Sequence, residues 1–414
     1  MNDKELYSNI LGVKHPWGVT DVKLDIPNKT VTIRVEYDRE QKLRCPECDK
    51  IGTVYDHVVR RWRHLDTCQM TTMIESDVPR VSCDVHGVKQ IRVPWAESKS
   101  HFTALFEALV ITWLKETSLT GVANLLRLSW DQVSGIQERA VNRGLARREE
   151  KPLVNVAIDE TSFQKRHEYV TAIYDKDLDV VLDVLNDRKA ETLETWLKQR
   201  PEEHRDLIKT VSMDMWDPFI LAVKNTFPNA MDVICFDRFH VAQHFGKAVD
   251  KVRAQEHRSY IYNKMESPLA KTKHDWLRNS SRTDNRSRRE FMILTRSTLR
   301  TARAWAIKES AAQLWNYSYR GVAVNAWRQL LGWICRCRLE PVIKVGRMVK
   351  NYLWGIINAI MAKTSNAVAE SKNARIQRIK KMACGFRNRK RFRMSILFHL
   401  GGLDLMPKTL RNYV

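Results

Sequence analysis

The run Leu153-Val154-Asn155-Val156-Ala157-Ile158-Asp159 is apolar almost throughout and ends on a carboxylate. A short apolar run of this kind is typical of a strand buried within a sheet. Further strands are predicted over 168–174, 178–185, 207–213 and 232–235, and helices over 191–199 and 217–226. Three adjacent strands followed by alternating strands and helices favour a mixed α/β sheet.

The segments on either side of this sheet have different patterns. After it, residues 240–355 are predicted to be almost continuous helix, followed by a polar helix from about Asn366 to Lys381. Before it, residues 101–148 have helical periodicity, whereas 20–95 combine short alternating runs with paired Cys and His residues. The sequence therefore predicts a small β-rich module, a helical module, and an α/β domain interrupted by an all-α insertion.

The size and charge of the chain indicate several domains and an anionic partner. Its 414 residues exceed one comfortable core, and its net charge of +22 favours nucleic acid as the partner. The opening Met1-Asn2-Asp3-Lys4-Glu5 lacks the pattern of a secretory signal, so the eight cysteines are expected in a reducing cytoplasm. No apolar stretch reaches the length of a bilayer span, so no membrane association is expected.

Paired Cys and His residues in the first module have the spacing of a metal site. Cys45 and Cys48 are separated by two residues, as are Cys83 and His86. Two such pairs suit a tetrahedral site of soft ligands, in which a structural Zn²⁺ ion holds the module together. The alternative ligands in the same module are Cys68, His57 and His64.

Residues 118–133 have the pattern of a helix-turn-helix unit, because a short helix and a break are followed by Ser129, which is placed to cap a second helix. The second helix of such a unit lies in the major groove of DNA. The side chains expected to reach bases or phosphates from it are Trp130, Gln132 and Gln137. The alternative is an ordinary helical hairpin used for dimerisation.

Other basic and aromatic residues are also candidates for DNA contact. Arg61 and Arg63 lie in the first module, where they either face DNA or belong to a solvated loop. Between positions 372 and 393 there are ten Lys or Arg residues and no acidic one, which favours phosphate binding that weakens steeply with salt. The members of this run that we single out are Lys372, Arg375, Arg378, Lys381, Arg387 and Arg389. In the insertion, most tryptophans are expected in the core, with Trp315 and Trp333 as candidates for stacking on an unpaired base.

Two carboxylates follow predicted strands, and a third lies on the polar helix. Asp159 and Asp214 each end an apolar strand, which is where ligands gather in α/β sheets, and Glu370 lies on the polar face of its helix. Three hard oxygen ligands at one edge suit two Mg²⁺ or Mn²⁺ ions that act on a phosphodiester. Spacing alone leaves Glu160 and Asp217 open as alternatives.

Eight separate motifs, in this order, resemble one family. They are CPEC at 45–48, WRHLD at 62–66, VPRVSC at 78–83 with HGV at 86–88, VPWA at 93–96, AIDE at 157–160, VSMDMW at 211–216, FDRFHV at 236–241 and SNAVAESKN at 365–373. The chain resembles, over most of its length, the IS-L-three family of bacterial insertion-sequence transposases. The resemblance implies an RNase H-like Asp/Asp/Glu nuclease behind a zinc-binding module and a helix-turn-helix.

The resemblance also implies roles for particular residues. It assigns catalysis and binding of the two Mg²⁺ or Mn²⁺ ions to Asp159, Asp214 and Glu370. Asp237 and His240 are similar to a pair found in other transposases with helical insertions, which implies a supporting role. The alternative for His240 is a buried, hydrogen-bonded histidine at the edge of the sheet.

These inferences together predict the organisation and function of the chain. The expected parts are a zinc-binding module over 1–98, a helix-turn-helix module over 99–150, an RNase H-like domain over 151–245 and 356–414 with a basic C-terminal segment, and a helical insertion over 246–355. The expected activity is binding of the terminal inverted repeats of an insertion sequence, followed by strand cleavage and strand transfer. A homodimer or larger complex on double-stranded DNA in the bacterial nucleoid is expected. The alternatives are a site-specific nuclease without strand transfer and a DNA-binding repressor.

Overall fold

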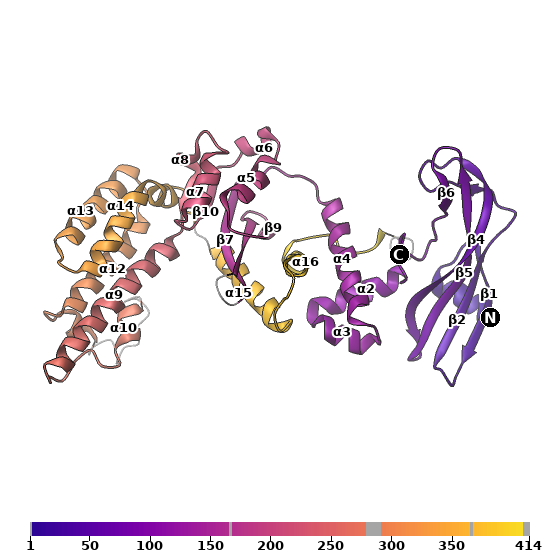
Figure 1. Ribbon diagram of the computed structural model, residues 1–414, viewed down its shortest axis with the longest axis horizontal. Helices are drawn as coiled ribbons and strands as arrows, with labels where there is room; N and C mark the ends of the chain where they lie inside the picture. The colour runs from indigo at the N-terminus through magenta and orange to yellow at the C-terminus, as the bar shows by residue number, and fades with distance from the viewer. Residues whose placement is uncertain (1, 165–167, 279–290, 365–366, 409–414) are drawn as a thin grey trace. The chain divides into compact units, whose positions relative to one another are not determined.

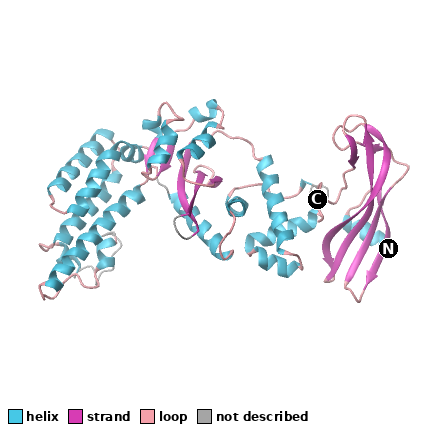
Figure 2. Ribbon diagram, in the orientation of Figure 1, coloured by secondary structure: helices cyan, strands magenta, loops and turns pink. Residues whose placement is uncertain are grey.

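The computed structural model describes residues 2–164, 168–278, 291–364 and 367–408. By its internal contacts the chain divides into two compact units, residues 1–149 with 402–414 and residues 150–401. The first unit contains a twisted sheet and a group of short helices, and the second contains a mixed sheet and long helices (Figures 1 and 2). The order of these elements is the order expected from the sequence.

The sheet of the first unit is dominated by one long hairpin. Its strands lie in the order β1-β2-β5-β4-β3, with β6 paired to β5, and only β2 and β5 are parallel. The turn of the β4–β5 hairpin has positive φ angles at both Cys68 and Gln69, as the tight turns that suit twisted hairpins require. The bounds are α1 (Asp3–Leu11), β1 (Trp17–Asp25), β2 (Thr30–Tyr37), β3 (Leu43–Arg44), β4 (Ile51–Thr67), β5 (Met70–Cys83) and β6 (Gly87–Gln90).

Three tryptophans form the centre of this small core. The ring of Trp95 is fully buried and meets Trp17 and Trp62 edge-on, with centroids 4.9 Å and 5.5 Å away. Edge-to-face packing of this kind is a favoured arrangement of aromatic rings. Large side chains thus compensate for the small number of residues that the module can bury.

The helical part of the first unit has a polar cap at the start of each helix. Thr103 caps α2 (Ala104–Glu116), Ser118 caps α3 (Leu119–Leu126), and Ser129 forms a capping box with Gln132 at the start of α4 (Trp130–Arg147). Ser129 was expected to cap the second helix of the helix-turn-helix, and this is confirmed. Arg127 closes α3 in the left-handed conformation, which makes the sharp turn into α4.

The end of the described chain packs on α4. Arg143 donates to the carbonyl oxygen of Leu405 at 2.6 Å, and Arg147 pairs with Asp404 at 2.8 Å. Gly144 lets this segment approach, because a β-carbon there would lie 2.7 Å from Leu403. Residues 356–414 were expected to complete the catalytic domain, but residues 402–408 belong to the first unit.

The second unit is built on a five-stranded mixed sheet in the order β11-β10-β7-β8-β9. Strands β7, β8 and β9 are antiparallel neighbours, whereas β10 and β11 are added in parallel on the other side of β7. This is the mixed sheet that the sequence predicts. The bounds are β7 (Asn155–Gln164), β8 (Glu168–Asp175), β9 (Val180–Leu185), α5 (Ala190–Lys198), α6 (Glu202–Asp206), β10 (Thr210–Met213), α7 (Asp217–Lys224), α8 (Ala230–Val233) and β11 (Ile234–Phe236).

The first strand of this sheet is longer than expected. We predicted a strand that ends at Asp159, but β7 continues to Gln164, so Asp159 lies within the strand. The reason is the hairpin with β8, which pairs with β7 as far as Gln164, whereas the parallel ladder to β10 stops at Ala157. Asp159 is therefore beyond the end of the parallel ladder although its own strand continues.

Long helices follow the last strand. Helix α14 packs over β11, and Gly355 permits this approach because a β-carbon there would lie 2.5 Å from the ring of Phe236. Trp276 and Trp327 are fully buried in the same core, as expected for most insertion tryptophans. The helices are α9 (Arg238–Tyr262), α10 (Lys273–Leu277), α12 (Arg300–Gln313), a 3₁₀ turn (Leu314–Asn316), α13 (Arg320–Arg336), α14 (Glu340–Met361), α15 (Ala367–Met382) and α16 (Arg389–Leu400). Across the described residues, we find no helix that is both long and apolar enough to cross a membrane.

Candidate active site and nucleic-acid interface

Three aspartates lie level with one another at one edge of the second sheet. Ser212 pairs with Ala157, and Met213 pairs with Phe236. Continuing this register places Asp214 beside Asp159 on one side and beside Asp237 on the other. The carboxyl ends of parallel strands are where α/β sheets bind ligands. The parallel strands therefore bring together two of the predicted catalytic carboxylates and the predicted supporting one.

His240 lies between two of these aspartates from the first turn of α9. Its Nδ1 atom is 3.5 Å from Oδ2 of Asp214, and its Nε2 atom is 3.9 Å from Oδ2 of Asp237. Asp237 is only 4% exposed, whereas Asp214 and His240 are half-buried. Asp237 is the N-cap of α9 and His240 lies three residues later in its first turn, so both side chains lie at the start of the helix, beside the end of β11.

The third predicted carboxylate comes from α15. Glu370 is exposed on the first turn of this helix. Partial burial raises the pKa of its carboxyl, the negative charge of Asp237 raises the pKa further, and His240 opposes the shift. Glu370 therefore lies close enough to Asp237 and His240 to feel their charges, at the edge that carries Asp159 and Asp214.

Helix α15 is fastened along β7 by a row of polar contacts. Asn373, one turn after Glu370, donates from Nδ2 to Oδ2 of Asp159 at 2.6 Å and accepts from the hydroxyl of Tyr174 at 2.8 Å. One turn further on, Gln377 donates to the hydroxyl of Thr161, and Lys380 donates to the carbonyl of Ser162. The helical spacing of Asn373 from Glu370 is a signal that could have identified Asn373, but its role and that of Tyr174 at Asp159 were not predicted, and no sequence pattern points to Tyr174.

The electrostatics of this edge favour a cation. Burial raises the pKa of Asp159 to about 6, against the opposing effects of the Glu160 backbone N–H and His240, and the charges of Asp237 and Asp214 raise it further. The ligand atoms are hard carboxylate oxygens, which suit Mg²⁺ and Mn²⁺. Such ions would relieve the repulsion between these carboxylates, so the residues present fit a divalent metal site.

The two alternative carboxylates have other partners. Glu160 lies 3.4 Å from the guanidinium of Arg188, and Asp217 accepts a hydrogen bond of 2.9 Å from the hydroxyl of Tyr352. Asp217 also belongs to the start of α7 rather than to the aligned strand ends. These contacts favour Asp159 and Asp214 over Glu160 and Asp217 as ligands.

The Cys/His residues of the first unit form a compact cluster. The ligand atoms of Cys45, Cys48, Cys83 and His86 all lie within 4.8 Å of one another, and in the described part of the chain no other group of three or more Cys, His, Asp or Glu is so close. The Sγ atom of Cys83 is 3.7 Å from Nδ1 of His86 and from Sγ of Cys48. Three thiols and an imidazole at these separations fit a tetrahedral Zn²⁺ ion.

Tight backbone turns create this cluster. The amide of Asp49 donates to the carbonyl of Cys45, and Gly87 has a positive φ of 65° at the turn between β5 and β6. The backbone N–H groups of His86 and Val85 point at the Cys83 sulfur, and with the His86 side chain they lower the pKa of this thiol to about 6. The thiolate form, which is the metal ligand, is therefore stabilised by the protein itself.

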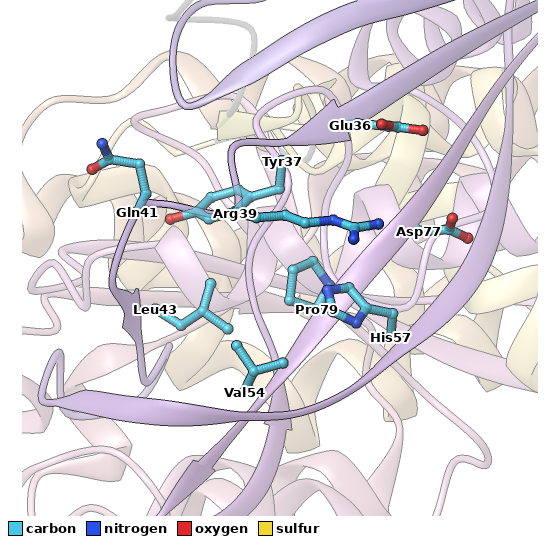
Figure 3. A pocket seen from close by; sticks show the side chains of 9 residues that line it. All are labelled: Glu36, Tyr37, Arg39, Gln41, Leu43, Val54, His57, Asp77 and Pro79. Carbon is cyan, nitrogen blue, oxygen red and sulfur yellow. The ribbon is translucent and has the colours of Figure 1, made fainter.

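The alternative zinc ligands lie elsewhere in the same module. Cys68 is exposed in the turn of the β4–β5 hairpin, and His64 is buried with its Nδ1 2.9 Å from the hydroxyl of Thr103. His57 lines a separate pocket of about 150 Å³ with Tyr37, Asp77 and other residues (Figure 3). None of the three belongs to the cluster.

Three residues predicted to contact DNA are buried, and these predictions are wrong. Arg63 is 7% exposed and is held by Asp66, because β4 is tied at this point to the segment before α2. Gln137 is 5% exposed, because it lies on the face of α4 that packs into the helical module. Lys372 is 4% exposed and pairs with Asp179 at 2.7 Å, because α15 is docked on the sheet.

The other predicted contacts are at least partly accessible. Arg61 is exposed and pairs with Glu75, and Gln132 is exposed but takes part in the capping box of α4. Trp130 is half-buried at the start of α4. Of the members of the basic run that we singled out, the exposed ones are Arg375, Arg378, Lys381, Arg387 and Arg389, the last of which lies 3.2 Å from Glu168. Basic groups therefore remain exposed on α15 and the segment that follows it.

The two candidate stacking tryptophans of the insertion differ. Trp315 is partly buried and packs edge-on against the fully buried Trp327, with centroids 6.3 Å apart. This contact gives Trp315 a place in the core. Trp333, on α13, is 37% exposed.

Comparisons with known proteins agree with this geometry. The model of ISL3-type DDE transposases, described as "Transposase", matches residues 156–396. The "Helix-turn-helix domain of transposase family ISL3" matches 91–141, and the "zinc-finger of transposase IS204/IS1001/IS1096/IS1165" matches 41–86.

Two curated relatives match over almost their whole length. The transposase for insertion sequence element IS1557 of Mycobacterium tuberculosis is 25% identical, over 94% of this chain and 93% of its own. The transposase for insertion sequence element IS1001 of Bordetella parapertussis is 23% identical, over 96% of this chain and 98% of its own. The chain therefore belongs to the ISL3 (IS-L-three) family and is a DNA transposase.

Proposed function

We propose that this transposase binds the terminal inverted repeats of its insertion sequence and cuts and joins strands at the edge formed by Asp159, Asp214 and Glu370. The observation that carries the proposal is the alignment of Asp159, Asp214 and Asp237 across three neighbouring strands, with Glu370 brought to them by α15. The charge of these groups is concentrated where a metal-bridged phosphate is expected to lie.

Two Mg²⁺ or Mn²⁺ ions held by Asp159, Asp214 and Glu370 would supply activation of the attacking water or 3′-hydroxyl and stabilisation of the leaving oxygen. The chain itself positions the ligands. Asn373 donates to Oδ2 of Asp159 and the backbone N–H of Glu160 donates to Oδ1, so the orientation of this carboxylate is fixed. His240 lies between Asp214 and Asp237, with one ring nitrogen facing each carboxylate. Asp237 and His240 thus have a supporting role.

DNA is held by other parts of the chain in this proposal. The start of α4, with Trp130 and Gln132, lies in the major groove of the terminal repeat. Exposed cations of α15 and the segment after it, among them Arg375 and Arg378, bind phosphates near the cut. Because two element ends must be processed together, the active form is a dimer or larger complex on DNA.

The experiment is cleavage and joining of a labelled duplex that carries the element terminus, in Mg²⁺ or Mn²⁺. The wild type is compared with Asp159→Ala, Asp214→Ala and Glu370→Ala, and with Asp232→Asn as a control, since Asp232 is an exposed aspartate of α8 away from the aligned strand ends. We expect the first three variants to bind DNA normally and to lose about 100- to 1,000-fold in rate, as loss of a charge-stabilising group at a reacting centre does. Asp232→Asn is expected to cut and join like the wild type.

Other outcomes separate the alternatives. Variants that still cut at the wild-type rate would show that these three carboxylates are wrongly chosen. A wild type that cuts but never joins would indicate a nuclease without strand transfer. A requirement for a metal other than Mg²⁺ or Mn²⁺ would contradict the assignment of hard ligands.

A further inference from the structure

A groove opens directly beside the aligned carboxylates. It lies between the start of α5 and the length of α7, has a volume of about 840 Å³, and is lined by Arg188, Lys189, Trp216, Leu221, Lys224 and neighbouring residues. This volume is within the range of about 300–1,000 Å³ of clefts that take small ligands. Trp216 follows Asp214 by two residues, so their α-carbons are at most about 7 Å apart.

The lining of the groove is unusual for a surface that only meets duplex DNA. Two large apolar side chains of its lining are accessible, since Trp216 is 37% exposed and Leu221 is 51% exposed. The same lining includes the exposed cations Lys189 and Lys224. In a duplex the faces of the bases are stacked on one another and are not accessible, so an exposed aromatic ring among cations is better suited to an unpaired nucleotide, whose base has a free face.

Arg188 packs on the ring of Trp216 and holds it in place. Its guanidinium carbon lies 4.7 Å from the ring centroid of Trp216 and 5.1 Å from that of Tyr169. The same guanidinium lies 3.4 Å from Glu160, beside Asp159. Contacts with two rings and a carboxylate fix the guanidinium, which in turn fixes one face of the indole. The groove is therefore built before DNA arrives.

The acidic residues of the groove do not oppose this ligand. Asp217 accepts a hydrogen bond from the hydroxyl of Tyr352 at 2.9 Å. Glu191 lies in the first turn of α5 and is exposed. The amino groups on base edges can donate hydrogen bonds to a carboxylate, and the phosphate of the nucleotide can pair with the lysines.

We propose that this groove receives the base of an unpaired nucleotide next to the cut phosphate, with the base stacked on Trp216 and its phosphate near Lys189 or Lys224. The proposal rests on the proposed function, since it takes Asp214 to lie at the reacting phosphate. It places base stacking on Trp216 of the catalytic domain and not on Trp333 of the insertion. An unpaired base held here would let the strand bend away from its complement at the cut.

The test uses 2-aminopurine, placed one position at a time on both sides of the cut in a duplex that carries the element terminus. Fluorescence is read with full-length protein in Ca²⁺, so that the signal does not depend on cleavage. We expect the wild type to change the fluorescence strongly at one position, Trp216→Ala to abolish this change, and Trp216→Phe to keep most of it. Trp333→Ala is the matched control, because Trp333 has the same 37% exposure, and it is expected to behave like the wild type.

A second readout is affinity for a duplex whose flank is mismatched at the responding position. Trp216→Ala is expected to weaken its binding by about 5- to 150-fold, the effect of losing one base–aromatic stack. The proposal would be overturned if no position responds, if the response is unchanged in Trp216→Ala, or if it is lost only in Trp333→Ala. Cleavage is then measured separately in Mn²⁺. A wild type that does not cut but has a Trp216-dependent signal would contradict the catalytic assignment and support the groove.

Discussion

The Cys/His cluster of the first unit and the carboxylate edge of the second both gather anionic ligands, but the pKa values of Cys83 in the cluster and Asp159 at the edge are shifted in opposite directions. At the cluster, backbone N–H groups lower the pKa of Cys83 to about 6 and so stabilise its anion. At the carboxylate edge, burial and neighbouring charges raise the pKa of Asp159 to about 6 and so destabilise its anion. A closed set of soft ligands suits a metal that holds the fold, and an open set of hard ligands suits metals that act on a substrate.

The largest expected effect concerns the closed cluster. Cys45→Ser combined with Cys83→Ser is expected to remove the bound zinc and unfold the first module, because the binding energy of a structural Zn²⁺, about 10–16 kcal/mol in zinc-finger peptides, is folding energy. Zinc content and limited proteolysis check this. Cys68→Ser, at the exposed hairpin turn, is the control and should keep its zinc. Zinc retained in the double variant would show that Cys45 and Cys83 are not ligands of a structural zinc ion.

A smaller effect is expected from the residue that positions Asp159. Asn373→Ala should lower the cleavage rate by about 10- to 100-fold and raise the Mn²⁺ concentration needed for half-maximal rate, as loss of a partner of a metal ligand does. Gln377→Ala is the matched control one turn along α15, where the partner is Thr161. A rate loss without any change in the Mn²⁺ requirement would mean that Asn373 acts only on the docking of the helix.

The raised pKa of Asp159 also predicts that the stability of the second unit depends on pH. The pKa of Asp159 in the folded protein, about 6, is above its ordinary value of 3.8, so this group's contribution to stability is complete below pH 4 and is lost as the pH rises through 6. Without divalent ions, Asp159→Asn is therefore expected to melt at a higher temperature than the wild type at pH 7.5, with the difference closing near pH 4. Scanning calorimetry of the transition of the second unit measures this.

Added Mg²⁺ should remove the same difference, because ions that bind the folded protein stabilise it. Wild-type protein is expected to gain melting temperature in Mg²⁺, and Asp159→Asn is expected to gain little. Asp232→Asn serves as the control for loss of one negative charge. If the difference in melting temperature between Asp159→Asn and the wild type is equally large at pH 4 and pH 7.5, the Asp159 carboxylate is not destabilised by its surroundings.

The smallest effect concerns the cations around the open site. Arg375→Ala and Arg378→Ala should each weaken DNA binding a few-fold and reduce the slope of log affinity against log salt by about 1, as loss of one phosphate contact does. Lys372→Ala is the matched control on the same helix, because Lys372 is buried against Asp179. It should lower stability and leave the salt slope unchanged. A reduced slope for Lys372→Ala would indicate that α15 undocks when DNA binds.

The sequence by itself determined the features that depend on local spacing. Within each pair of zinc ligands a tight turn brings the two residues together whatever surrounds them, although it is the pairing of β4 with β5 that brings the two pairs to one cluster. Ser129 caps α4, because a cap needs only the next turn of the helix. Apolar runs before Asp159 and Asp214 predicted buried strands, and these strands place both carboxylates at one edge.

Only the tertiary structure decided which polar side chains are buried and which pairs meet. Arg63, Gln137 and Lys372 are residue types that often bind DNA, but all three side chains are buried by tertiary packing. Arg63 and Lys372 contact segments that are distant in the sequence, and Gln137 lies on the packed face of α4. Asn373 reaches Asp159 only because α15 docks along β7. Burial and long-range hydrogen bonds depend on the packing of whole elements, which residue spacing does not encode, whereas turns, caps and strand runs depend on the backbone of a few neighbouring residues.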